Sequence, residues 1–75
     1  MSDTKNALLK IVKTARRWVY DYEVTTEFNL GDRYQKPSTL ERRLRELRLS
    51  GAINGGKISE RRGGRKVLLT RYRRA

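Results

Sequence analysis

Cysteine and histidine are both absent from this 75-residue sequence. Without cysteine the chain forms neither a disulfide nor a thiolate metal site. Without histidine it lacks the commonest general base of enzymes and the commonest metal ligand. Asp21 with Glu23, or Asp32 alone, offers carboxylates to a metal, but carboxylates in turns are usually just solvated. We therefore expect a protein that is not an enzyme and that has no metal or other cofactor.

Long apolar runs are missing as well. No stretch approaches the roughly 18–20 residues that span a membrane. Residues 1–4 lack the basic and apolar segments of a signal peptide. Only 36% of the residues are hydrophobic, which allows a thin core. We expect one domain over residues 1–75, a cytoplasmic location and no membrane partner.

Negative charge is scarce in the second half of the chain. The whole sequence has 19 Lys+Arg, 8 Asp+Glu and a net charge of +11. Residues 1–35 contain 6 basic and 5 acidic side chains, whereas residues 36–75 contain 13 and 3, a net charge of +10. Cations gathered in this way suit a polyanion, because neutralised phosphates release their counterions. Nucleic acid is favoured as the partner over an anionic membrane or an acidic protein.

Glycine and proline, which interrupt helices, are few in this chain, and they divide it into three helical pieces followed by a hairpin. An apolar stripe at spacings of three and four predicts a first helix that begins near Asp3 or Thr4. We expect Trp18 and Phe28 to anchor the core. The breaks are Gly31, Pro37, Gly51, Gly55-Gly56 and Gly63-Gly64, and the stripe is Leu8, Ile11, Val12, Ala15, Trp18 and Val19.

The next two helices are predicted from capping residues. Thr25 or Thr26 is suited to cap a short second helix that Gly31 ends. Ser38 with Glu41 fits a capping box for a third helix over about residues 38–50. Its apolar seam is Leu40, Leu44 and Leu47, and Gly51 is placed to close it in a left-handed conformation.

Beyond the third helix the pattern becomes extended, over residues 52–53, 58–62 and 65–72. Gly63-Gly64 lies between two of these segments and predicts a two-residue hairpin turn, since both glycines tolerate positive φ. The sequence thus predicts an α+β fold with three helices and a C-terminal β-hairpin.

The third helix has a basic face. At roughly 100° per residue, Ser38, Arg42 and Arg45 lie about 140–200° from Leu40, and Leu49 lies on the same face. A helix that packs on the protein by its apolar seam in this way can offer hydrogen-bond donors on its basic face to the major groove of DNA. The alternative is an ordinary solvated helix, on which Glu41–Arg45 and Arg42–Glu46 are i,i+4 ion pairs.

The hairpin tip strengthens the case for an anionic partner. Four cations, Arg61, Arg62, Arg65 and Lys66, surround one tight turn. Their mutual repulsion destabilises the isolated protein, and phosphates would relieve it.

Residues 39–53 followed by residues 62–67 resemble the winged helix-turn-helix of bacterial repressors, with the ArsR, MarR and GntR families closest in pattern. The resemblance implies a recognition helix of about residues 38–50 in the major groove and a wing of about residues 58–70 on the backbone or in the minor groove. Carried over by position, it places Thr39, Glu41, Arg42 and Arg43 at or beside DNA, and it forms the wing tip from Arg62, Arg65 and Lys66. With the patterns above, the candidate DNA-binding residues are Lys36, Ser38, Thr39, Glu41, Arg42, Arg43, Arg45, Arg61, Arg62, Arg65 and Lys66.

The chain departs from those repressors in having no metal-sensing residues, no effector domain and no added dimerisation helix. We therefore expect a small sequence-specific binder of double-stranded DNA, such as a transcriptional regulator or a phage or plasmid factor, with a homodimer on DNA left open. The alternative is an RNA-binding or ribosome-associated winged helix. RNA readers stack exposed aromatics on unpaired bases, but here most aromatics lie in the weakly basic first half, which favours duplex DNA.

Overall fold

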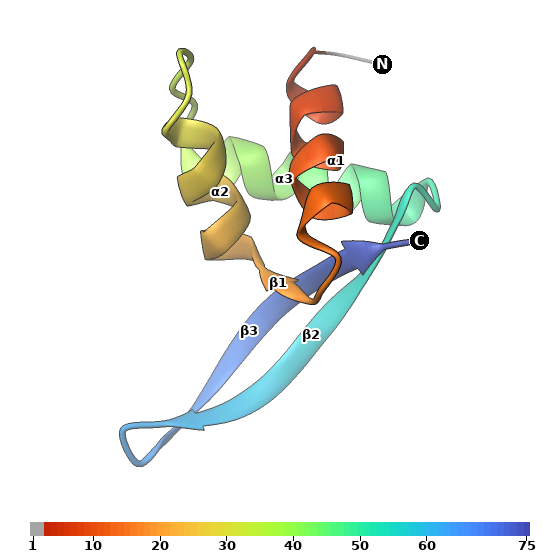
Figure 1. Ribbon diagram of the computed structural model, residues 1–75. Coiled ribbons are helices and arrows are strands. Elements are labelled where there is room, and N and C mark those ends of the chain that lie inside the picture. Colours follow the sequence, from red (N-terminus) through yellow and green to blue (C-terminus); the bar gives the residue numbers. More distant parts are fainter. Residues whose placement is uncertain (1–2) are drawn as a thin grey trace.

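The computed structural model describes residues 3–75 and has an α+β fold, with three helices and a three-stranded antiparallel sheet in that part of the chain (Figure 1). The fold class predicted from the sequence is confirmed at this level. The elements in chain order are α1 (Asp3–Ala15), β1 (Val19–Tyr20), α2 (Asp21–Asn29), α3 (Pro37–Leu49), β2 (Ile53–Arg62) and β3 (Arg65–Arg74).

Helix α1 contributes Leu8 and Val12 to the core, as its apolar stripe predicts. The helix ends at Ala15, because Arg16 adopts a left-handed φ of 54°. The expectation that Trp18 anchors the core is wrong. Its side chain lies at the surface, 37% exposed, with the Arg71 guanidinium 4.3 Å from the ring centroid. The stripe breaks there because the chain leaves the helix before Trp18.

Helix α2 begins four residues earlier than Thr25, so the predicted threonine cap is wrong. The Tyr20 backbone N–H instead donates a 3.0 Å hydrogen bond to the Glu23 carboxylate, three residues inside the helix. Thr25 is buried, and its hydroxyl donates to the carbonyl oxygen of Tyr22. A capping contact in which the glutamate acts through its carboxylate requires no Ser or Thr at the cap, which is why the sequence pattern missed it.

Helix α3 begins at Pro37, and Ser38 lies within its first turn, so the predicted Ser38–Glu41 capping box is wrong. Proline suits this position, because its fixed φ is helical and its missing N–H would have had no partner in the helix. The apolar seam is confirmed by complete or nearly complete burial of Leu40, Leu44 and Leu47.

The end of α3 is the one that the sequence predicts. Gly51 has a φ of 83°. The N–H of Ala52 donates to the Leu47 carbonyl and the N–H of Gly51 donates to the Arg48 carbonyl, each at 3.0 Å. This pair of bonds satisfies carbonyl groups that the helix itself leaves without partners.

Strands β2 and β3 form a regular hairpin from Ile53↔Arg74 to Arg62↔Arg65. The predicted turn is confirmed, with φ of 58° at Gly63 and 78° at Gly64. The sequence did not indicate β1, which pairs with β3 through Val19↔Tyr72 and Tyr20↔Arg71 and gives the strand order β1-β3-β2.

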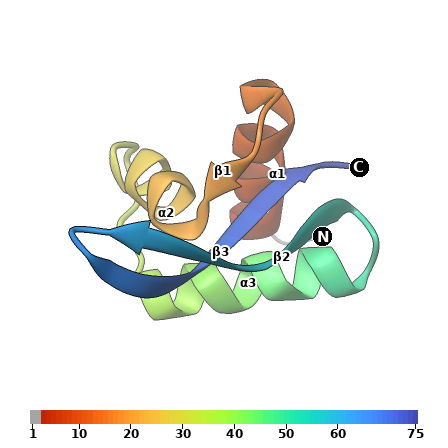
Figure 2. The ribbon, with the colours of Figure 1, turned by 90° about the horizontal axis from the view of Figure 1, so that it is seen from below.

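The core lies where the three helices meet the base of the sheet. Figure 1 shows the far half of the hairpin projecting beyond the helices, and Figure 2 shows α3 running beneath the sheet. The molecule measures 39 × 25 × 20 Å along its principal axes. The buried apolar residues are Leu8, Val12, Val19, Val24, Leu40, Leu44, Leu47, Ile53 and Tyr72.

Substitution of Gly51 tests the helix terminus. A Cβ at this position meets nothing within 4 Å, so backbone strain alone should destabilise Gly51→Val. A β-branched residue in the left-handed region costs at least about 1 kcal/mol. Gly56→Val is the matched control, because Gly56 also has open space but no positive φ. Equal thermal stabilities of the two variants would contradict this account of the α3 terminus.

Candidate nucleic-acid interface

The outward face of α3 carries three polar side chains that the sequence placed there. Ser38, Arg42 and Arg45 are exposed, on the side opposite the buried leucines. Leu49 shares this face and is 73% exposed. Lys36, also a candidate, is exposed at the residue preceding the helix. The basic face expected from helical periodicity is therefore present.

The ion pairs on α3 differ from those expected at a spacing of four. Glu46 pairs with Arg43, at 2.8 Å, and with Lys5 of α1, at 3.5 Å, rather than with Arg42. The hydrogen bond from Arg43 is the main cause that lowers the pKa of Glu46. Within residues 3–75, neither Arg42 nor Arg45 has a carboxylate within ion-pair distance. Arg43, although a candidate contact, is engaged by the protein itself.

The two faces of the hairpin separate its cations. Residues that pair across an antiparallel ladder share a face, and successive residues alternate between faces. Arg61 pairs with Lys66 and shares the face of Lys57 and Thr70, which is the α3 side. Arg62 pairs with Arg65 and lies on the opposite face. Of the four cations at the tip, two therefore share a side with α3 and two do not.

Arg62 lies in a cluster that joins the hairpin to the start of α2. Its guanidinium donates to the Tyr22 hydroxyl and to Glu60, both at 3.2 Å, and lies over the Tyr20 ring at 5.1 Å. The Tyr20 hydroxyl donates to the same Glu60 carboxylate. The rings of Tyr20 and Tyr22 stack at 5.3 Å. This cluster links residues about 40 positions apart in the sequence and holds the hairpin against the helices.

A polar cleft of about 290 Å³ separates α3 from the base of the hairpin. Its lining includes two candidate residues, Glu41 and Arg45, while Thr39 is half-buried elsewhere on α3. Sequence reasoning missed Arg48 and Lys57 here. Arg48 lies at the edge of the leucine seam rather than on the outward face, and Lys57 is recognisable only once its alternation with Ser59 and Arg61 is set in a strand. The complete lining is Asp21, Glu41, Arg45, Arg48, Lys57, Thr70 and Tyr72.

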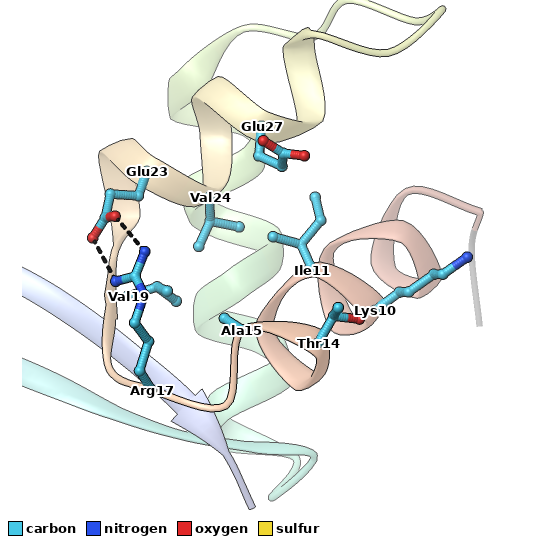
Figure 3. Close-up of a pocket in the computed structure, with 9 residues that line it drawn as sticks. All are labelled: Lys10, Ile11, Thr14, Ala15, Arg17, Val19, Glu23, Val24 and Glu27. Atoms are coloured by element: carbon cyan, nitrogen blue, oxygen red, sulfur yellow. Dashed lines mark hydrogen bonds and ion pairs between the residues drawn. The ribbon is translucent and has the colours of Figure 1, made fainter.

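A second hollow lies between α1 and α2, on the side away from α3 (Figure 3). Its volume is about 440 Å³, and its apolar lining includes Ile11 and Val24. Two cations and two carboxylates surround it, and one of each forms the 2.9 Å Arg17–Glu23 ion pair drawn in Figure 3. A hollow of balanced charge offers a polyanion no net attraction, unlike the outward face of α3 and the hairpin.

No known protein family model, curated protein or solved structure matches this chain. In the part of the chain that the structure describes, no helix has the length and apolar character needed to cross a membrane.

The Glu60 cluster predicts a pH dependence of stability. The hydrogen bond from Tyr20 is the main cause that lowers the pKa of Glu60 from its ordinary value of 4.5, and Arg62 adds to the effect. A carboxyl whose pKa is lower in the folded state stabilises the fold above its ordinary pKa, and this contribution disappears as the pH falls through the lowered value. Thermal unfolding should therefore show a loss of stability between about pH 5 and pH 3.

Glu60→Gln should lower the unfolding midpoint at pH 7 and flatten part of this acid limb. Glu27→Gln is the control, because Glu27 is exposed and has no ion-pair partner among residues 3–75; it should leave the midpoint at pH 7 nearly unchanged. Superimposable profiles for Glu60→Gln and the unmodified protein would show that the cluster does not hold the hairpin.

Proposed function

We propose that this protein is a winged helix-turn-helix that binds double-stranded DNA as a small regulator, with α3 in the major groove and the β2–β3 hairpin as its wing. The observation that carries the proposal is the alignment of unpaired cations on one side of the molecule. Arg42 and Arg45 on α3 face outward without ion pairs, and Arg61 and Lys66 lie on the same side of the hairpin. The order helix, strand, helix, helix, hairpin supports the winged-helix assignment.

The dimensions of α3 suit a major groove. Its 13 residues extend about 20 Å at 1.5 Å per residue, and the major groove of B-DNA is wide enough to admit an α-helix. The hairpin projects past the helical body, so it extends along the duplex from the α3 contact (Figure 1). Arginines without internal partners on such a helix can offer both guanidinium donors to guanine.

The main alternative is an RNA-binding or ribosome-associated winged helix, and for binding to duplex RNA the position of α3 argues against it. The major groove of A-form RNA is too deep and narrow for side chains to read. The exposed basic face of α3 therefore has a natural target in B-DNA. Selection from random duplex DNA, with an RNA pool in parallel, tests the proposal directly, and an enriched palindrome would also indicate two copies on one site.

The salt dependence of binding tests the electrostatic part of the proposal. If about six to eight cations of residues 36–75 reach phosphates, log K against log salt should have a slope of roughly −5 to −7. Titration of duplex DNA at four or five salt concentrations measures it. A slope shallower than about −2 would remove the electrostatic basis of the proposal.

Arg42→Ala tests base readout by α3. A lost base contact should weaken the selected site by about 1–3 kcal/mol more than random DNA. Lys66→Ala, on the wing, should weaken both equally and reduce the magnitude of the salt slope by about one, as a phosphate contact does. Lys13→Ala on α1 is the control and should change neither. If Arg42→Ala weakened both DNAs by the same factor, α3 would act only as an electrostatic surface.

A further inference from the structure

Tyr72 is 3% exposed and forms part of the core, yet its hydroxyl has no hydrogen-bond partner among residues 3–75. No side-chain oxygen or nitrogen in this part of the chain is both fully enclosed and without a partner. The hydroxyl is therefore not sealed in the core. Since Tyr72 lines the cleft between α3 and the hairpin, the cleft is the opening that its hydroxyl reaches.

Gly55 makes room for the Tyr72 ring. The two residues are cross-strand partners, and a Cβ on Gly55 would lie 2.4 Å from a carbon of the ring. The ring therefore packs directly on the β2 backbone, with the rest of its surface in the core. Burial raises the pKa of the Tyr72 hydroxyl, so it stays protonated, and a hydrogen-bond donor, at neutral pH. The fold thus holds a fixed neutral donor at the edge of the cleft.

The charges around the cleft define what can occupy it. Three cations, Arg45, Arg48 and Lys57, line it together with two carboxylates, Asp21 and Glu41. None of the three cations forms an ion pair within residues 3–75. The surplus of one positive charge suits an anion with a single charge. A phosphodiester carries one charge, whereas a free phosphate at neutral pH carries more.

We propose that this cleft is a binding site for one backbone phosphate, with the Tyr72 hydroxyl donating a hydrogen bond to a phosphate oxygen. Arg45, Arg48 and Lys57 provide the positive charge, and the half-buried Thr70 hydroxyl is a second donor on the same wall. The site lies between the proposed recognition helix and the proposed wing. The inference therefore rests on the proposed function and adds to it the contact that fixes the register of the protein on the duplex.

Tyr72→Phe tests the site with little disturbance of the fold, because it removes only a hydroxyl that bonds to no described residue. The unfolding midpoint should be unchanged or slightly higher. Affinity for duplex DNA should fall about tenfold, equally for the selected and random sequences, as loss of a donor to a charged group predicts. Tyr34→Phe is the matched control, since Tyr34 is 72% exposed and lies outside the cleft, and it should bind as the unmodified protein does.

A scan with neutral methylphosphonates, one position at a time, locates the phosphate. A methylphosphonate at one position should weaken binding of the unmodified protein but not of Tyr72→Phe. A methylphosphonate at any other contacted position should weaken binding of both proteins. Parallel measurements with DNA and RNA duplexes identify which nucleic acid supplies the phosphodiester. A loss of affinity of Tyr72→Phe for either duplex supports the site. Equal binding by Tyr72→Phe and the unmodified protein, or identical scans for both, would overturn it while leaving duplex binding intact. Failure of the unmodified protein to bind any duplex would instead refute the proposed function and this site together.

Discussion

The burial of the α3 leucines determines how the rest of the molecule is arranged. Leu40 and Leu44 are fully buried and Leu47 is 2% exposed, in a core that contains nine buried apolar residues among residues 3–75. Burial of each such side chain contributes about 1.5–3 kcal/mol to the stability of the fold. A rotation of α3 about its own axis by the angle between successive residues would expose these leucines, which are a large share of the core. The helix therefore has a single stable orientation, and that orientation directs Arg42 away from the protein and places Arg45 at the cleft beside the hairpin.

The hairpin is oriented by a different set of contacts. Its base enters the core through Ile53 and Tyr72, and β1 pairs with β3 at the same level. Farther out, the Tyr20–Glu60–Arg62 cluster joins it to the start of α2. A two-stranded hairpin alone is only marginally stable in water. The third strand and the cluster therefore hold the projecting hairpin in a defined position relative to α3.

Elements with strong local signals could be predicted from the sequence, and contacts between distant residues could not. The leucine seam, the Gly51 terminus and the Gly63-Gly64 turn each depend on residues that are close together in the sequence, and each is confirmed. The surface position of Trp18 depends on where α1 ends and on Arg71, far away in sequence. The candidate site likewise depends on contacts between residues that are distant in the sequence.

Periodicity predicted the outward face of α3. The cleft, in contrast, became visible only when Lys57 and Tyr72 of the sheet were placed beside Arg48. The division of the four tip cations between two faces likewise required the strand register. Sequence composition indicated how much positive charge the second half carries, but only the fold shows which cations share a side.

The arginines of the chain differ in whether the protein itself supplies their partners. Arg17, Arg43 and Arg62 are bonded to Glu23, Glu46 and Glu60, and each of these pairs stabilises a junction or a helix. Surface pairs of this kind contribute little individually, yet they account for three of the eight acidic residues of the chain. The cations on the α3 side, among them Arg42, Arg45 and Lys66, form no ion pair within residues 3–75. Three carboxylates are bonded to structural arginines, while several cations on the α3 side have no ion-pair partner among residues 3–75, and this distribution supports the proposal of a partner that supplies negative charge from outside, as a phosphate backbone does.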